Sequence, residues 1–413
     1  MNIGIQTWGS RGDINPWIAL GQGLAEAGHR VCLYYTSYTG SDFTMHESPG
    51  LTIKPTKIFS EGSRAYEKVI SKKIYNMEPL ELTDYMVKDI FDLFHEEIVL
   101  AAKDLCKNNE LIINNPNLYQ TAAIAEKYNV PRINLLVESQ YTPNNSVSDF
   151  TADHINLYFL ERVNIFRQSI NLPPIADVRS EAYNSPLLNI LIYSKIFCNE
   201  NENWDNRFRH SGYLELKNPP EFEMPAELKQ FLDAGEPPVF FSMGSLSFFE
   251  GESFEILQIF NDAINLSGCR AIIQGNFDQM TVMPGKHNVF LLGYMPHNAI
   301  LPMCSGMVHH GGAGTTHTSI LNGCPSIIIA YAWDQFYWGR ELLKMGICPG
   351  MMKRKYLDPL QLAGAIRKLM KDPEYKMKTD DARRKMKREK GVAKTVRIIE
   401  EFVSEHKNKR GQL

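Results

Sequence analysis

The chain has 413 residues, and because one hydrophobic core rarely serves a globular protein of that length, we expect two domains. Its 44 basic and 47 acidic residues leave a net charge of −3, which gives no electrostatic basis for binding nucleic acid. The seven cysteines are odd in number and contain no CxxC pair, as in reduced core residues, so we expect a cytoplasmic protein.

The first half predicts alternating strands and helices. Its start, MNIGIQTWG, has a strand pattern and lacks the basic and apolar regions of a signal peptide, and no window is as long as a transmembrane helix. Asn15 and Pro16 predict a helix N-cap and first turn, which leaves Ser10 to Asp13 as a loop. Strands are predicted over residues 2–7, 31–35, 110–114 and 132–137, and helices over 15–27, 80–107 and 118–128.

A second alternating series follows the proline-rich stretch 216–225, which we interpret as a linker. Two α/β halves joined by a linker predict a cleft between domains, a common place for ligands. The expected domains are 1–215 and 226–392, with a last helix at 393–413. Strands are predicted over 239–243, 270–274, 289–293 and 326–330, and helices over 253–266, 340–345, 358–371, 374–390 and 393–406.

Residues 306–335 hold the strongest motif. A strand ends in His309 and His310, a glycine turn follows at residues 311–314, and a helix is expected near Thr315 and Thr316. Glycines let the backbone approach a ligand, and the start of a helix offers N–H groups to an anion. Because open α/β sheets bind ligands beyond the carboxyl ends of their strands, Asp334 and Gln335, which follow the next strand, are expected nearby.

HHGGAGTT, followed by Asp334, Gln335, three aromatic residues and Gly339, resembles the donor-sugar motif of nucleotide-sugar-dependent glycosyltransferases of the GT-B fold. The pattern is similar to that of sterol glucosyltransferases and glycopeptide-antibiotic glycosyltransferases of the UDP-glycosyltransferase superfamily. The resemblance implies two Rossmann-like α/β domains facing a cleft and a last helix that crosses back to the first domain, with residues 396–403 half buried. It is strong in the motifs and weak over residues 40–230, where this family shapes its acceptor pocket.

The donor-binding residues expected on these grounds lie mostly in the second half. The His310 ring, the N–H groups that follow Gly312 and the Thr315 hydroxyl can bind a diphosphate, whereas His309 alternates to the opposite face and is expected to be structural. By resemblance Tyr294 stacks on the nucleobase, Met295 bonds it through the main chain, and Asp334 and Gln335 hold the sugar, although Asp334 also suits a helix N-cap. The expected set is Ser10, Arg11, Gly244, Ser245, Tyr294, Met295, His297, His310, Gly312, Ala313, Gly314, Thr315, Asp334 and Gln335.

The loop at residues 10–13 resembles the G-[ST]-R-G-D loop of the same families. There Ser10 and Arg11 are expected to reach the donor phosphates, and the resemblance makes Asp13 the general base for the acceptor hydroxyl. Because Asn15 is the expected cap, the Asp13 carboxylate is expected to point into the cleft. The alternative is a solvated loop aspartate. Plant-type relatives have a Glu for the ribose where this chain has Thr318, so no ribose contact is assigned and UDP is not separated from dTDP.

No Asp-x-Asp pair and no His/Cys ligand spacing are present, so no metal and no cofactor are expected. The leading hypothesis is an inverting, metal-independent hexosyltransferase that moves a sugar, most simply from UDP-glucose, to a hydroxyl of an apolar acceptor. Sterols, polyketides, phenols and lipids are the acceptor classes considered. The basic stretch 383–397 is interpreted as a solvated helix face, with peripheral membrane contact as the alternative.

Three other functions stay open. A nucleotide-sugar epimerase or hydrolase of the same fold would form product without an acceptor, and a non-catalytic nucleotide-sugar-binding module would bind UDP without turnover. A nicotinamide oxidoreductase is disfavoured, because Gly4, Gly9 and Gly12 do not fit the GxGxxG spacing of dinucleotide-binding folds.

Overall fold

The computed structural model describes residues 1–56, 77–138, 146–197, 204–216, 223–244, 252–275, 288–331 and 334–410. It divides into two compact units. The first unit comprises the described residues up to 56, from 84 to 216 and from 389 onward, and the second comprises 77–83 and 223–388. Residues 77–83 thus group with the second unit, and within it Lys355 Nζ lies 2.5 Å from Glu78 Oε1.

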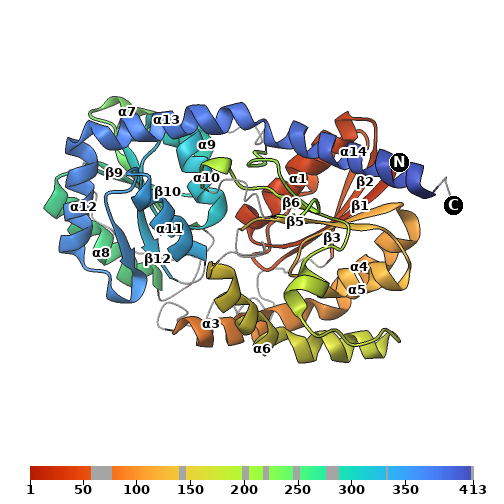
Figure 1. The fold of residues 1–413 in the computed structure, drawn as a ribbon. Coiled ribbons are helices and arrows are strands. Elements are labelled where there is room, and N and C mark those ends of the chain that lie inside the picture. Colours follow the sequence, from red (N-terminus) through yellow and green to blue (C-terminus); the bar gives the residue numbers. More distant parts are fainter. Residues whose placement is uncertain are drawn as a thin grey trace. The chain divides into compact units, whose positions relative to one another are not determined.

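The first unit is built on a seven-stranded parallel sheet in the order β3-β2-β1-β4-β5-β6-β7. Figure 1 shows helices α1 and α14 on one face of this sheet and α4 and α5 on the other. The strands are β1 (Asn2–Gly9), β2 (Arg30–Ser37), β3 (Leu51–Pro55), β4 (Leu111–Asn114), β5 (Arg132–Leu136), β6 (Leu188–Leu191) and β7 (Phe208–His210). The helices are α1 (Arg11–Glu26), α4 (His95–Asn108), α5 (Tyr119–Lys127), α6 (Ser146–Ser169) and α14 (Gly391–Arg410), while α3 (Pro79–Tyr85) lies mostly in the segment that groups with the second unit.

Strand β1 shows why both faces of the first sheet are covered. Its side chains alternate, so Ile3 and Ile5 are fully buried in the core on the α1 side. Gly4 and Gln6 face α4, where Gln6 Nε2 donates to the carbonyl of Ile98 at 2.9 Å. A parallel strand buried on both faces needs such an internal partner for every polar group it carries.

The C-terminal helix α14 packs on α1, as predicted from the family resemblance. Ile399 is fully buried and Val396 is 8% exposed, both in the core that α1 shares with the sheet. The closest approach is at Gly23 of α1, where an added Cβ would lie 2.5 Å from Val392 Cγ1. A glycine is therefore required at this helix crossing.

The chain enters the first unit for the last time at Glu389, next to the place where it leaves that unit after residue 216. Glu389 Oε1 accepts hydrogen bonds from the Ser194 hydroxyl and from the Lys195 N–H, both at 2.8 Å. Glu389 Oε2 lies against Gly212, where a Cβ would approach it to 2.7 Å. Gly391 approaches the carbonyl of Tyr213 too closely for any side chain. The incoming and outgoing segments are thus packed together inside one unit.

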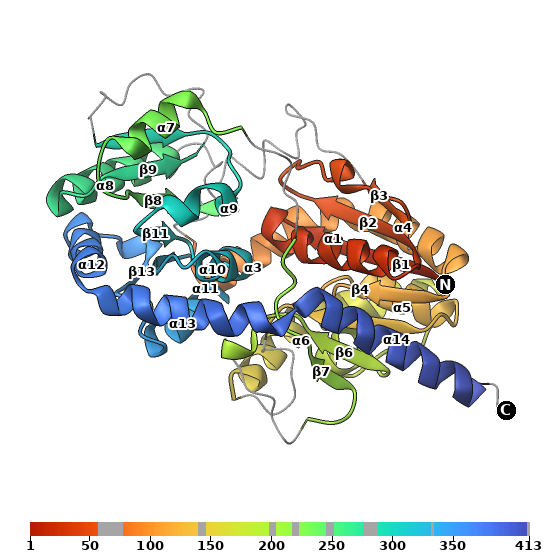
Figure 2. The same ribbon diagram turned by 90° about the horizontal axis from the view of Figure 1, so that it is seen from above.

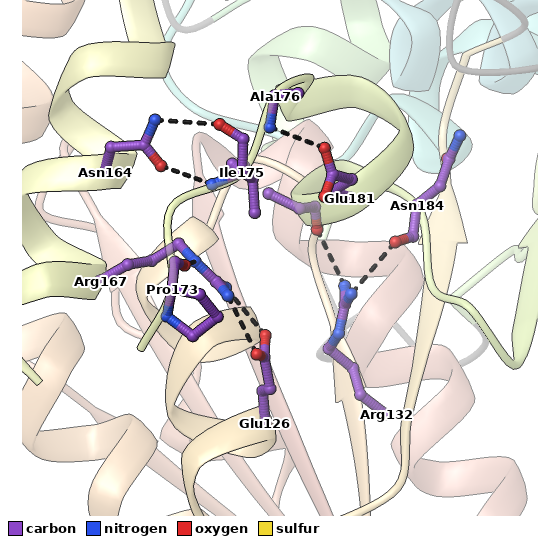
Figure 3. Close-up of polar contacts among 10 residues, drawn as sticks. Glu126, Arg132, Asn164, Arg167, Pro173, Ile175, Ala176, Glu181 and Asn184 are labelled. Atoms are coloured by element: carbon purple, nitrogen blue, oxygen red, sulfur yellow. Dashed lines mark hydrogen bonds and ion pairs between the residues drawn. The ribbon is translucent and has the colours of Figure 1, made fainter. Parts of the chain in front are cut away.

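Polar contacts connect the end of α6 and the segment after it to α5 and to the start of β5 (Figure 3). Arg167 forms two hydrogen bonds with Glu126, at 2.8 and 2.9 Å, and its Nε donates to the carbonyl of Pro173. Arg132 is buried and donates to the carbonyls of Ala182 and Asn184 at 3.0 and 3.1 Å. Each cation is matched by oxygen acceptors, which a buried guanidinium requires.

The second unit is built on a six-stranded parallel sheet in the order β10-β9-β8-β11-β12-β13. Helices α8 and α12 cover one face and α9 and α10 lie on the other (Figure 2). The strands are β8 (Val239–Ser242), β9 (Ala271–Gln274), β10 (Val289–Leu292), β11 (Gly306–His309), β12 (Ser326–Ala330) and β13 (Met351–Lys353). The helices are α7 (Ala226–Asp233), α8 (Glu252–Ser267), α9 (His297–Ile300), α10 (Ala313–Leu321), α11 (Asp334–Lys344), α12 (Pro359–Lys371) and α13 (Pro373–Glu389).

The predicted fold class, two Rossmann-like parallel sheets in an α/β protein, is confirmed. The pattern missed β3, β6, β7 and β13, each with five residues or fewer, together with helices α6, α7 and α9. The long helix predicted over 80–107, with room for one break, is interrupted once, by the π-helical turn Met86–Ile90 and the 3-10 turn Phe91–Phe94 that follows it. Short strands and helical irregularities leave little periodicity for a sequence to show.

We expect Gly23→Ala to destabilise the first unit by about 1–3 kcal/mol, because the new methyl group must displace Val392 from the crossing of α1 and α14. Chemical denaturation followed by circular dichroism measures the change. Gly12→Ala in the same helix is the matched control, because a Cβ there has no atom within 4 Å. Equal stability of the two variants would contradict the close crossing.

Candidate functional site

Glycines surround His310 at the carboxyl edge of the second sheet. His310 follows β11, and Gly244 follows the neighbouring strand β8. A Cβ on Gly244 would lie 2.6 Å from His310 Cε1, and one on Gly312 would collide with His310 Nε2. Any larger residue at either position must move the ring. The imidazole is therefore held between two stretches of bare backbone, partly exposed to solvent.

Both histidines of this corner are neutral. Burial, with a contribution from His297, lowers the pKa of His310 to about 4. Burial, with contributions from His310 and His297, lowers the pKa of His309 well below its usual value. His309 is fully buried, and its Nδ1 accepts a hydrogen bond from the Gly311 N–H at 3.0 Å. His309 thus fixes the start of the glycine turn, and a neutral His310 can donate one N–H to a ligand.

Helix α10 begins earlier than predicted, at Ala313, with Gly312 as its N-cap. Its first intrahelical hydrogen bond runs from the Thr316 N–H to the Gly312 carbonyl, at 2.9 Å. The N–H groups of Ala313, Gly314 and Thr315 precede that bond, so they have no carbonyl within the helix to pair with. All three residues are accessible to solvent. They present donors and the positive end of the helix dipole beside His310.

The start of α11 adjoins the same corner. Gly311, with φ +88°, passes so close to α11 that a Cβ on it would lie 3.1 Å from the Gln335 carbonyl oxygen. Gln335 is 8% exposed, and its Oε1 accepts from the Tyr331 N–H at 2.7 Å. Asp334 is the first residue of the helix, and its Oδ2 accepts from Trp338 Nε1 at 3.2 Å.

A chain of contacts joins α10 to α11. The ring of Trp338 lies edge-on to that of His317, with 5.2 Å between centroids. His317 Nδ1 in turn lies 2.7 Å from the Ala313 carbonyl oxygen. Trp338 and His317 are both buried. They fix the first turn of α10 relative to Asp334.

The expected nucleobase segment lies at the same edge. Tyr294 is 47% exposed, and its neighbour Met295 is buried in the core beneath it. His297 begins α9, and burial lowers its pKa to about 4. The second unit thus gathers Gly244, Tyr294, Met295, His297, His310, residues 312–315, Asp334 and Gln335 at one edge of one sheet. Ser245 lies outside the described residues.

In the first unit, the expectation that Asn15 caps the first helix is wrong. Helix α1 begins at Arg11 with Ser10 as its N-cap, and Pro16 lies inside it. Asp13 therefore takes part in the helix start. Its Oδ2 accepts from the Ser10 N–H and from the Ser10 hydroxyl, both at 2.8 Å. Asn-Pro resembles a helix start, but here Asp13 bonds back to Ser10 as in a capping box.

Gly9 makes room for the Asp13 carboxylate. Gly9 has φ +136°, and a Cβ there would lie 2.6 Å from Asp13 Oδ2. Desolvation raises the pKa of Asp13, against the lowering effect of the two Ser10 hydrogen bonds, although the side chain keeps contact with solvent. Arg11 lies in the same turn, with its guanidinium carbon 5.1 Å from the centre of the Phe43 ring.

Sequence reasoning missed three residues that shape the corner: Gln274, His317 and Trp338. Trp338 was inside the quoted motif as an unassigned aromatic, and His317 lies four residues after Ala313, the spacing of one helical turn. Among the described residues, no group of three or more His, Cys, Asp or Glu side chains is arranged to hold a metal ion.

We expect His309→Asn to reduce the acid sensitivity of the fold. An unfolded histidine binds a proton below pH about 6.5, whereas buried His309 stays neutral, so stability falls as the pH is lowered through that value. One such group accounts for at most about 1.4 kcal/mol per pH unit. Asn can still accept from the Gly311 N–H without titrating.

Urea denaturation at pH 7 and pH 5 measures this effect. The variant is expected to lose up to about 2 kcal/mol less than the wild type between the two pH values. His406→Asn, at a ring that stacks on Phe402 in α14, is the control and should follow the wild type. An identical loss in His309→Asn and the wild type would show that His309 is already protonated at pH 5.

Comparisons with known proteins agree with this geometry. Residues 271–402 match the family model "Erythromycin biosynthesis protein CIII-like, C-terminal domain". The chain is 26% identical to a sterol 3-beta-glucosyltransferase of Arabidopsis thaliana over 444 residues, which cover 96% of this chain and 67% of the plant protein. It is 23% identical to the O-mycaminosyltylonolide 6-deoxyallosyltransferase of Streptomyces fradiae over 430 residues, 97% of each chain. The chain spans about two thirds of the length of the plant relatives it matches.

Solved structures share the fold. The glycosyltransferase of kitacinnamycin superposes with a TM-score of 0.71 at 15% identity, over 97% of this chain and 98% of that one. The glycosyltransferase VinC, in complex with dTDP, gives 0.65 at 17% identity, over 98% and 99%. No helix in the part of the chain that the structure describes is long and apolar enough to cross a membrane. The chain is thus similar over nearly its whole length to proteins named as glycosyltransferases, and its residues 271–402 match an EryCIII-like C-terminal domain.

Proposed function

We propose that the protein transfers a hexose from a UDP- or dTDP-sugar to a hydroxyl group of an apolar small molecule, with inversion and without a metal ion. The observation that carries this proposal is the corner formed by Gly244, His310 and the first turn of α10. Bare backbone, a neutral imidazole and N–H groups without intrahelical partners there suit a diphosphate. Charge on the departing diphosphate is then stabilised by these donors, together with Arg11, in place of a cation.

Residues near the proposed diphosphate site could also hold the sugar and the nucleobase of the donor. Asp334 lies at the start of α11, where its carboxylate can accept from a sugar hydroxyl, and Gln335 offers its amide N–H₂, since its Oε1 accepts from Tyr331. The exposed ring of Tyr294 offers a stacking surface for a nucleobase. Relatives are named for glucose and 6-deoxyallose transfer, and one structure of similar fold holds dTDP, which supports a nucleotide-linked hexose as donor.

Asp13 is the proposed general base. It takes the proton of the acceptor hydroxyl as the oxygen attacks the anomeric carbon, while the bond from that carbon to the diphosphate breaks and the nucleoside diphosphate leaves. One carboxylate oxygen is held by Ser10, which leaves Oδ1 for the acceptor. The Asp13 side chain is exposed, so an acceptor hydroxyl can reach its carboxylate.

Aromatic side chains next to Gly9 support an apolar acceptor. Trp8 packs edge-on against Phe91, with 4.8 Å between ring centroids, and lies 5.8 Å from Tyr38. Phe91 in turn contacts Phe159, with 6.4 Å between centroids. Trp8, Tyr38 and Phe159 are only half buried, so part of each ring faces outward. The plant relatives are named for sterols, which are apolar acceptors with a hydroxyl group.

We expect Asp13→Asn to reduce transfer at least about 100-fold, the usual contribution of a general base, while UDP binding is unchanged. The Asn oxygen still accepts from Ser10, so the helix start is kept. Mass spectrometry of a sterol and phenol panel incubated with UDP-glucose and dTDP-glucose measures transfer. Glu26→Gln, at the exposed far end of the same helix, is the charge-matched control. Wild-type transfer by Asp13→Asn would show that another group is the base.

We expect His310→Ala to weaken UDP binding about 10- to 100-fold, because it removes a hydrogen bond to a charged group. Isothermal titration calorimetry with UDP measures the affinity. His406→Ala in α14 is the control and should bind as the wild type does. Unchanged affinity in His310→Ala would exclude this ring from the phosphate site.

A further inference from the structure

Gln274, the last residue of β9, connects three neighbouring parts of the second unit through its side chain. Its Nε2 donates to the Met295 carbonyl at 2.7 Å, with a longer contact of 3.4 Å to the Gly293 carbonyl. Its Oε1 accepts from the Ser242 hydroxyl at 3.2 Å and lies 3.0 Å from His297 Nε2. One amide thus joins the end of β8, the segment after β10 and the start of α9.

The hydrogen-bonding groups of these partners allow only one orientation of the Gln274 amide. The two carbonyls can only accept, so the amide nitrogen must face them. The amide oxygen then faces Ser242 and His297. Because burial lowers the pKa of His297 to about 4, its ring is neutral and must carry its hydrogen on Nε2 to donate to that oxygen. Turning the amide over would set its oxygen against two carbonyls.

The segment that Gln274 holds has no regular structure of its own. Residues 293–296 lie between the end of β10 at Leu292 and the start of α9 at His297. Met295 is 1% exposed, whereas the adjacent Tyr294 is 47% exposed at the carboxyl edge of the sheet. Burial of Met295 and the Gln274 hydrogen bond fix the backbone from which the Tyr294 ring projects.

We propose that Gln274 is a positioning residue for nucleobase recognition. It holds the main chain of residues 293–297 so that the Tyr294 ring and the Met295 backbone meet the base without rearrangement. This inference rests on the proposed function and deepens it. Since a segment already ordered before binding loses less conformational entropy, removing the Gln274 amide should weaken the contribution of the base to affinity and leave the diphosphate contribution unchanged.

Calorimetry with two ligands separates these contributions. UDP carries both base and diphosphate, and inorganic pyrophosphate carries only the latter. We expect Gln274→Ala to reduce the affinity for UDP at least about tenfold while the affinity for pyrophosphate stays within twofold of wild type. Gln274→Glu should behave similarly, because a carboxylate accepts from Ser242 and His297 but cannot donate to Met295. Ser242→Ala, which leaves the Met295 bond in place, should have the smaller effect.

Gln258→Ala is the matched control, because Gln258 is an exposed residue of α8 whose side chain donates to Asp262 in the same helix. Wild-type UDP affinity in both Gln274 variants overturns the inference, as does an equal loss for UDP and pyrophosphate, which indicates general damage. If Gln274→Ala fails to fold, Gln274→Glu and Ser242→Ala test the inference through the same comparison: the affinity of each variant for UDP and for pyrophosphate, relative to the wild type. Failure of the wild type to bind UDP or dTDP at all overturns the proposed function and this inference with it.

Discussion

The absence of side chains at Gly244 and Gly312 is the constraint on which the second unit's site depends. Either Cβ would occupy space that the His310 ring needs. Because the ring fits only there, it stands at the ends of β8 and β11, beside the first turn of α10. His309 adds a second constraint on the same turn, since its Nδ1 holds the Gly311 N–H. The corner is therefore built before any ligand arrives, which limits the reorganisation that binding requires.

Residues that would contact a ligand are themselves held by residues that would not. Trp338 and His317 connect Asp334 to the first turn of α10. In the first unit, Ser10 donates to the Asp13 carboxylate, and Gly9 leaves room for it. In each case a buried or backbone donor holds one oxygen of a carboxylate in place. This arrangement lets one side chain serve both the local fold and a reaction.

Much of the fold was predictable from sequence, because helices such as α8 and α12 have clear periodicity and the buried strands β8, β11 and β12 are mostly apolar runs. The site was predictable only where a motif marks it, as around His310. The start of α1 was predicted wrongly, because Asn15-Pro16 is a stronger sequence signal for a helix start than Ser10 and Asp13 are. The hydrogen bond between Ser10 and Asp13 is visible only in the structure. Gln274 left no signal, since a glutamine at the end of a strand means nothing until Met295 and His297 lie beside it.

The point where the chain returns to the first unit suggests how such proteins could exchange parts during evolution. There Glu389 packs against Ser194 and Lys195, and Gly391 packs against Tyr213. Since the chain leaves the first unit after residue 216 and returns at Glu389 next to its exit, most of the second unit is attached much like an insert within a surface loop, although residues 77–83 also group with it. Inserts with neighbouring ends can be exchanged without disturbing the host. Residues 217–388 of a homologue, grafted between these two points, would leave the core of the first unit intact.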